Sequence, residues 1–142
     1  MRILRIVAVV GLVVLFTGCC ACRRNRSVVP LAGVEWRLTQ LYGAGVTSEN
    51  YRVTLGVDGR LSGVGDCNRF SGTYTQTPGE SRTGGALAIG DGLVATRMMC
   101  LGQAREDQFF AMLREVDAYS IDGERLMLIR GGDVLAIFDL VN

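Results

Sequence analysis

The sequence predicts an α+β fold over residues 33–142: a curved, partly barrel-like antiparallel β-sheet packed on one main α-helix. Three observations lead to this prediction. Short segments with alternating apolar residues recur along the region, and turns rich in glycine and aspartate separate them. One stretch, residues 103–116, has the period of an amphipathic helix. The region is about 110 residues long, which suits a single domain with one core.

The first half of this region predicts strands. Asp58-Gly59 lies between two apolar alternations and indicates a hairpin, because both residues tolerate a positive φ. Residues 71–77 and 86–90 predict two further strands, and residues 78–85 between them form a loop rich in proline, glycine and charge. The apolar residues expected to alternate along the first strands and the hairpin are Val34, Trp36, Leu38, Val53, Leu55, Val57 and Leu61.

A helix is predicted over residues 103–116. Phe109, Met112, Leu113 and Val116 follow the i, i+3, i+4, i+7 pattern of one helical face. Such a stripe is typical of a core contact rather than of a cofactor site. Glu106, in an early turn together with the acidic residue after it, suits the positive end of the helix dipole.

The chain after the helix predicts a meander of three strands. They lie near residues 118–121, 125–130 and 134–139. Asp122-Gly123 and residues 131–133 supply the turns between them. Antiparallel neighbours with short turns favour a sheet that curves over the helix.

The amino terminus predicts a lipoprotein signal peptide over residues 1–18. A basic start is followed by an apolar run from Ile6 to Phe16, shorter than the ~20 residues that span a bilayer. The run ends in Thr17-Gly18-Cys19, which resembles the lipobox of bacterial lipoproteins. Cleavage between Gly18 and Cys19 would leave Cys19 as the acylated first residue. Phe16 departs from the smaller aliphatic residue usual there, and the alternative is an ordinary membrane-anchoring segment with an incidental cysteine.

Residues 19–32 are predicted to be a lipidated, flexible tether. Loss of the leader and its two arginines would change the formal charge from +1 to −1, so no nucleic-acid partner is expected. The basic cluster from Arg23 to Arg26 either lies near anionic headgroups or is a plain linker. The expected location is the cell envelope, lipid-anchored and facing the periplasm. Cys20, which is not acidic, favours the outer membrane over the inner one.

The chain contains no histidine. This excludes histidine-based triads, histidine general bases and most zinc sites. We therefore expect no metal, no cofactor and no enzyme activity.

Cys67 and Cys100 are the two cysteines within the predicted domain. Outside the cytoplasm, paired cysteines usually form disulfides, and their separation in sequence does not suit a C-x-x-C redox pair. A disulfide is the favoured prediction; free structural thiols and a catalytic thiol are the alternatives. Cys20 and Cys22 lie in the tether, where nothing decides whether they are free or paired.

Two phrases of the domain resemble the META domain of the heat-inducible HslJ-type bacterial lipoproteins. They are GDCNRFSGTY at 65–74 and LAIGDGLVATRMMC at 87–100, and similar opening and closing segments extend the resemblance over nearly all of 33–142. Asp66 departs from the glycine more usual in the family, but aspartate also tolerates a left-handed turn. The residues that match the family motif are Trp36, Asn68, Arg69, Phe70, Gly72, Tyr74, Thr96, Arg97, Met98 and Glu106.

The resemblance implies a compact α+β unit on an envelope lipoprotein, associated with stress and drug tolerance but without an agreed biochemical activity. We expect a non-enzymatic protein with a stress-related binding or envelope-support role, whose partner is an envelope protein or a small ligand. One alternative is a carrier with an apolar ligand between sheet and helix; a weaker one is a thiol- or carboxylate-based enzyme. Asn68, Arg69, Thr96 and Arg97 could line a binding patch. The favoured alternative is that Asn68 and Thr96 cap or brace turns, and Arg69 and Arg97 either brace the fold or form the patch.

Overall fold

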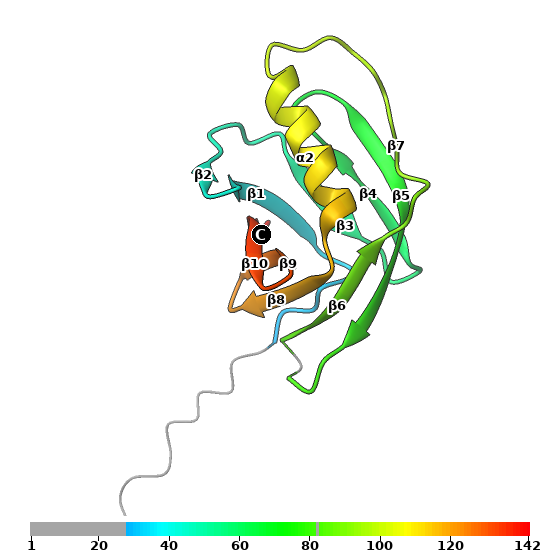
Figure 1. Ribbon diagram of the computed structural model, residues 1–142, viewed down its shortest axis with the longest axis vertical. Helices are drawn as coiled ribbons and strands as arrows, with labels where there is room; N and C mark the ends of the chain where they lie inside the picture. Colours follow the sequence, from blue (N-terminus) through cyan, green and yellow to red (C-terminus); the bar gives the residue numbers. More distant parts are fainter. Residues whose placement is uncertain (1–27, 82) are drawn as a thin grey trace, which may run out of the picture.

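A computed structural model of the chain describes residues 28–81 and 83–142 (Figure 1). Its main feature is a closed antiparallel β-barrel of eight strands. The barrel strands are β1 (Glu35–Leu41), β3 (Arg52–Leu55), β4 (Arg60–Val64), β5 (Arg69–Pro78), β6 (Gly84–Ile89), β8 (Ala118–Asp122), β9 (Arg125–Arg130) and β10 (Asp133–Leu140). Two short strands, β2 (Ala44–Gly45) and β7 (Val94–Ala95), pair with β1 and β5, and the helix α2 spans Gln103–Glu115.

The barrel closes where the first and last strands meet. β1 pairs with β3 on one side and with β10 on the other, with Leu38 opposite Phe138 and Trp36 opposite Leu140. The pairing register shifts after Leu38, a bulge of the kind that helps a sheet to curve. The predicted barrel-like sheet is thus confirmed, and its closure goes beyond the partly open sheet that the sequence predicted.

The two predicted Asp-Gly turns have the positive φ expected at glycine. Gly59 has φ +79° in the turn between β3 and β4, and Gly123 has φ +63° in the turn between β8 and β9. The expected inward orientation of Val57 is wrong, because this side chain lies in the β3–β4 turn and is 87 % exposed. The alternation of Val53 and Leu55 stops at Gly56, where the turn begins with a hydrogen bond to the carbonyl of Arg60.

The barrel interior is filled by side chains from one face of each strand. Burial alternates along β1, β3, β8, β9 and β10, as expected when one face of a strand points inward. Trp36, Phe109 and Phe138 are each fully buried. Leu31, which precedes the barrel, is 5 % exposed and accepts the indole N–H of Trp36 at 3.0 Å.

Helix α2 covers one end of the barrel rather than forming a second layer, so the predicted packing of the sheet on the helix is only partly confirmed. The predicted apolar stripe is buried, and Phe109 stacks edge-on against Tyr51 (5.2 Å between centroids) and Phe70 (5.7 Å). Phe70 belongs to the buried face of β5, and β-strand hydrogen bonds close the barrel wall. The side chains of α2 therefore reach the inward face of β5 through an end of the barrel and not through its wall. In Figure 1 the helix lies between β1 and β5.

Within residues 28–81 and 83–142, the helical structure does not reach the length and apolar character that a membrane crossing requires. The predicted signal peptide, the cleavage site at Gly18 and Cys19, and Cys20 and Cys22 lie outside the described residues.

Candidate functional site

A disulfide between Cys67 and Cys100 joins two loops at the α2 end of the barrel. Cys67 lies in the turn between β4 and β5, Cys100 lies in the loop before α2, and their Cα atoms are 6.4 Å apart. Both residues are half-buried. Of the three roles open to these cysteines, the structure has the disulfide.

Glu106 lies beneath this disulfide and is fully buried. Its Oε1 accepts hydrogen bonds from the backbone N–H groups of Cys67 (3.1 Å) and Asn68 (2.9 Å). Its Oε2 accepts a third, of 2.6 Å, from Nδ2 of Asn68. The first turn of α2 adds the positive end of the helix dipole. These donors compensate the loss of water around a buried carboxylate, and none of the ion pairs found among the described residues includes Glu106.

The carboxamide of Asn68 connects Glu106 to the loop before α2. Its Nδ2 also donates to the carbonyl of Met98 (3.1 Å), and its Oδ1 accepts from the Met98 N–H (2.7 Å) and the Thr96 hydroxyl (2.9 Å). The Thr96 hydroxyl oxygen in turn accepts the backbone N–H of Arg69 (3.1 Å). Asn68 and Thr96 thus brace the turns, as predicted. We call Cys67, Asn68, Thr96, Cys100 and Glu106 the hub, of which Asn68 and Glu106 are buried.

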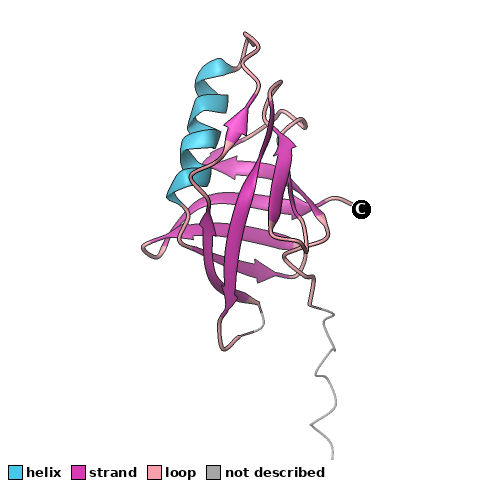
Figure 2. Cartoon of the chain, turned by 90° about the vertical axis from the view of Figure 1, so that its right-hand side faces the viewer, coloured by secondary structure: helices cyan, strands magenta, loops and turns pink. Residues whose placement is uncertain are grey.

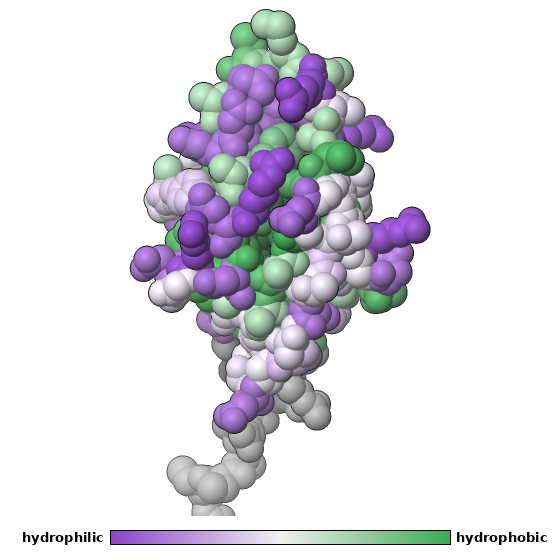
Figure 3. All heavy atoms as spheres, turned by 45° about the vertical axis from the view of Figure 1, so that its right-hand side comes forward, coloured by the Kyte–Doolittle hydropathy of each residue, from purple (hydrophilic) through white to green (hydrophobic). Residues whose placement is uncertain are grey.

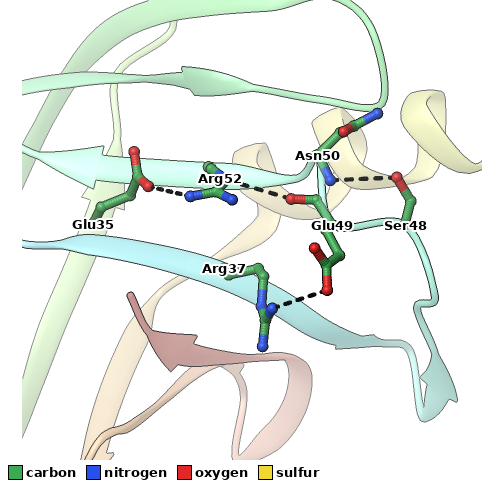
Figure 4. Close-up of polar contacts among 6 residues, drawn as sticks. All are labelled: Glu35, Arg37, Ser48, Glu49, Asn50 and Arg52. Carbon is green, nitrogen blue, oxygen red and sulfur yellow. Dashed lines mark hydrogen bonds and ion pairs between the residues drawn. The ribbon is translucent and has the colours of Figure 1, made fainter. Parts of the chain in front are cut away.

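Asp66 holds the same turn from its other side. The hydroxyl of Ser48 donates to Oδ1 of Asp66 (2.8 Å), and Nδ2 of Asn50 donates to the Asp66 carbonyl (2.9 Å). Figure 4 shows the start of this loop, where the backbone N–H of Asn50 also donates to Ser48 (3.4 Å). The turn needs no left-handed aspartate, because Asp66 is not among the residues with positive φ.

Ion pairs anchor the 48–50 loop to the outer face of the barrel. Arg52 pairs with Glu35 across β1 and β3 at 2.7 Å, and Arg37 pairs with Glu49 at 3.4 Å (Figure 4). Arg52 also donates to the Glu49 carbonyl at 3.3 Å. These partly exposed pairs position the loop and contribute little stability by themselves.

Most other motif residues build the fold. Trp36 and Phe70 lie in the core, and the Tyr74 hydroxyl donates to the Gly56 carbonyl at 2.6 Å. Gly72 lies against Leu93, whose Cα would be 3.3 Å from a Cβ at position 72. Arg69, Arg97 and Met98 are different, because their side chains are exposed.

The hub role of Glu106 was not predicted; from the sequence, this residue was expected to suit the helix dipole and was matched to the family motif. A signal for it exists: Glu106 lies three residues before Phe109 and seven before Leu113, on the same helical face as the apolar stripe. The glycine at position 65 is a second signal, because a Cβ there would overlap the Glu106 carboxylate.

Tyr51 lies on the core side of the hub. Its side chain is buried, and its hydroxyl is the one buried side-chain polar atom without a hydrogen-bond partner among the described residues. Burial, together with the negative charges of Asp66 and Glu106, raises the pKa of Tyr51 to about 12. The hydroxyl therefore stays protonated at neutral pH.

The donor atoms of Cys67, Cys100 and Glu106 lie within 4.8 Å of one another. Their chemistry does not suit a cation while the disulfide is formed. A disulfide offers no thiolate, and both oxygens of Glu106 already accept N–H hydrogen bonds.

A cleft of about 650 Å³ opens beside the hub, between residues 93–99 and α2. Asn68 and Glu106 form part of its lining, and Phe110 lines its helical side. β7 and the loop that follows it border the cleft and carry four exposed apolar side chains: Val94 (62 %), Met98 (57 %), Met99 (100 %) and Leu101 (111 %). This loop lies at the top of Figures 1 and 3, where Figure 3 shows apolar residues at the tip of the molecule.

Three comparisons with known proteins bear on the family. A search of curated proteins finds no match. Among solved structures, a protein determined by NMR has 26 % identity and a TM-score of 0.58, over 78 % of this chain and 91 % of that one. A crystal structure of a duf4847 family protein from Bacteroides vulgatus has 17 % identity and a TM-score of 0.57, over 77 % of this chain and 93 % of that one. The profile of the META domain matches residues 29–141. The chain therefore belongs to the META domain family.

Proposed function

We propose that this chain is a bacterial envelope lipoprotein whose META domain is a binding module and not an enzyme. The observation that carries the proposal is the hub around the buried Glu106. Its two sulfur atoms are joined to each other, and the polar atoms of Asn68 and Glu106 bond to neighbouring groups of the same fold. The residues that most resemble an active site are thus engaged in holding two loops together.

The chemistry left on the surface suits contact with a partner. The segment 94–101 beside the hub exposes four large apolar side chains and one basic side chain: Val94, Met98, Met99, Leu101 and Arg97. Contiguous exposed apolar side chains with a polar rim are typical of interaction sites. A stress-related or envelope-support role fits a domain that presents such a surface on a rigid base.

The proposed location depends on the amino terminus. Residues 1–18 would be the signal peptide, Cys19 the acylated residue and residues 19–32 the tether to the membrane, with the META domain following. The lipobox-like Thr17-Gly18-Cys19 supports this arrangement, and Cys20 favours the outer membrane. The domain would then face the periplasm, where the disulfide is chemically stable.

The carrier alternative would need an apolar space inside the barrel. The interior instead contains Trp36, Phe109 and Phe138, each fully buried, together with the aliphatic residues of the core. We therefore favour binding at the surface over binding in the interior.

The experiment is metabolic labelling of the full chain with a palmitate analogue, followed by separation of inner and outer membranes. Cys19→Ser should remove the label and the mature form, whereas the matched control Cys20→Ser should keep both. A mature chain that carries no lipid would overturn the proposed anchoring. Hydrolytic or transferase activity that disappears in Glu106→Gln, in a variant still folded by circular dichroism, would overturn the non-enzymatic function.

A further inference from the structure

The edge of β7 that faces away from β5 is free of strand partners among the described residues. Ala95 lies opposite Phe70, and the Thr96 N–H donates to the Arg69 carbonyl at 2.9 Å. Hydrogen bonding alternates along an antiparallel pair, so a residue next to one that bonds inward directs its N–H and C=O outward. The backbone groups of Ala95 therefore point away from the barrel.

This free edge borders the cleft. The cleft is lined on one side by residues 93–99 and on the other by the α2 face that contains Gln103, Asp107, Phe110 and Arg114. Figure 2 shows the short strand β7 between the helix and the long strand β5. A chain segment lying in the cleft would thus meet strand backbone on one side and helix side chains on the other.

The cleft is bordered by apolar side chains. Val94, Met98, Met99 and Leu101 are four of the eight large hydrophobic residues exposed in the described part of the chain. Methionine suits such a surface, because its unbranched side chain adapts to partners of different shape. The partner is therefore expected to present apolar side chains.

The charged groups around β7 are mostly basic. Arg97 and Arg114 line the cleft, and Arg69 lines a second, shallower hollow on the outer side of β7. Asp107 is the exposed acid of the cleft, since Glu106 is fully buried and bonded within the hub. This balance favours a partner with acidic residues.

The cleft lies far from the point where the chain enters the domain. In Figure 1 the first described residues are at the bottom of the barrel and the loop before α2 is at the top. The chain from Cys19 to Val28 spans at most about 30 Å when fully extended. A domain anchored through Cys19 would therefore direct the apolar tip away from its own membrane more readily than toward it, which favours a protein partner over a lipid surface.

We propose that the cleft between β7 and α2 binds an extended peptide segment of an envelope protein, with alternating apolar and acidic side chains, as an added strand on β7. Backbone hydrogen bonds to Ala95 give the partner its strand conformation, and the apolar residues of the 94–101 loop hold its alternate side chains. The proposal rests on the proposed binding function and names its site and partner class.

The test uses the full chain in detergent and a fluorescent eight-residue peptide of alternating valine and glutamate with blocked ends. A second peptide has the same sequence but N-methylated valines, which keeps the side chains and removes strand pairing. The first should bind and the second should not. Ala95→Pro should weaken binding by about tenfold, the worth of one or two backbone hydrogen bonds. This change removes an outward N–H and none of the β5 bonds.

Met99→Asp provides a second variant, because this side chain is fully exposed and has no part in the fold. It should also weaken binding, whereas Val57→Asp, at an 87 % exposed valine of the β3–β4 turn, should leave binding unchanged. Thermal melting shows whether each variant is folded.

Equal binding of both peptides, or unchanged binding in folded Ala95→Pro and Met99→Asp, would overturn the strand-addition site. Binding in detergent that is lost in phosphatidylethanolamine–phosphatidylglycerol vesicles would show the tip against a bilayer and would also overturn it. Lipid attachment at Cys19 is measured separately, so a failure of this proposal is distinguishable from a failure of the proposed anchoring.

Discussion

At the scale of single residues, the domain depends on one buried carboxylate. Glu106 is 0 % exposed and accepts three N–H hydrogen bonds from two consecutive residues of another loop. An amide of the same shape cannot replace it, because its NH₂ group would face N–H donors. Glu106 therefore has to be both buried and ionised to hold the turn that contains Cys67 and Asn68.

We expect Glu106→Gln to lower the free energy of unfolding by about 2–3 kcal/mol, because it leaves buried N–H donors without an acceptor. The measurement is urea denaturation of the oxidised protein. Asp107→Asn is the matched control, since this neighbouring acid of the same helix is exposed. If both variants lost the same stability, the charge of the helix and not the hub would be responsible.

Unlike Glu106→Gln, a substitution of Tyr51 is expected to keep or raise the free energy of unfolding. Its buried hydroxyl has no hydrogen-bond partner within residues 28–81 and 83–142, so Tyr51→Phe should keep stability at neutral pH or raise it by up to about 1 kcal/mol. Its pKa of about 12 lies above that of the unfolded chain, near 10. The stability that depends on the protonated hydroxyl is complete below pH 10 and is lost between pH 10 and 12.

The advantage of Tyr51→Phe over the unchanged protein should therefore grow as the pH rises from 10 to 12. Denaturant midpoints at pH 8, 10 and 11 measure it. Tyr74 and Tyr119, whose pKa values burial also raises, titrate in both proteins and cancel in the comparison. A difference in stability between the two proteins that stays constant from pH 8 to 11 would contradict the raised pKa of Tyr51.

At the scale of elements, the sequence predicted α2 within one residue and the hairpin at Asp58-Gly59 correctly. Both have local causes, a helical apolar period and a turn dipeptide that tolerates positive φ. The strand β7 was not predicted, because two residues carry no period and its pairing depends on the distant segment at Phe70. Of the hub, only the disulfide and the bracing by Asn68 and Thr96 were predicted, since burial of Glu106 is a tertiary property.

The disulfide connects two such elements, the turn before β5 and the loop before α2. Removing it through Cys67→Ala with Cys100→Ala should lower the free energy of unfolding by about 3–4 kcal/mol, the loop-entropy value for a crosslink of this span. The same denaturation measurement applies. Cys20→Ser with Cys22→Ser, in the predicted tether, should have no effect, and equal losses in the two double variants would contradict the prediction.

At the scale of the whole molecule, barrel closure makes the last strand indispensable. β10 lies between β9 and β1, and its Phe138 is fully buried. Closure could not be read from the sequence, because pairing between residues near 36 and 140 leaves no local pattern. The meander itself was predicted from its turns, and only the meeting of its last strand with the first was missed.

A chain ending at Gly132 lacks β10 and should therefore fail to fold. Loss of β10 exposes one edge of β9, one edge of β1 and the core beneath. Near-ultraviolet circular dichroism and amide chemical-shift dispersion would show this. A chain shortened only by Asn142, which follows the last strand, is the control. A cooperative unfolding transition in the truncated chain would mean that the barrel does not need closure.

The single tryptophan of the chain gives the domain a built-in optical reporter. Trp36 is fully buried in β1, at the seam with β10, and its indole N–H is bonded to Leu31. It is not among the residues that line the cleft between β7 and α2. Its emission should consequently follow the opening of the barrel and be insensitive to occupation of the cleft, so unfolding can be followed through Trp36 while the fluorescent peptide reports binding in the same sample.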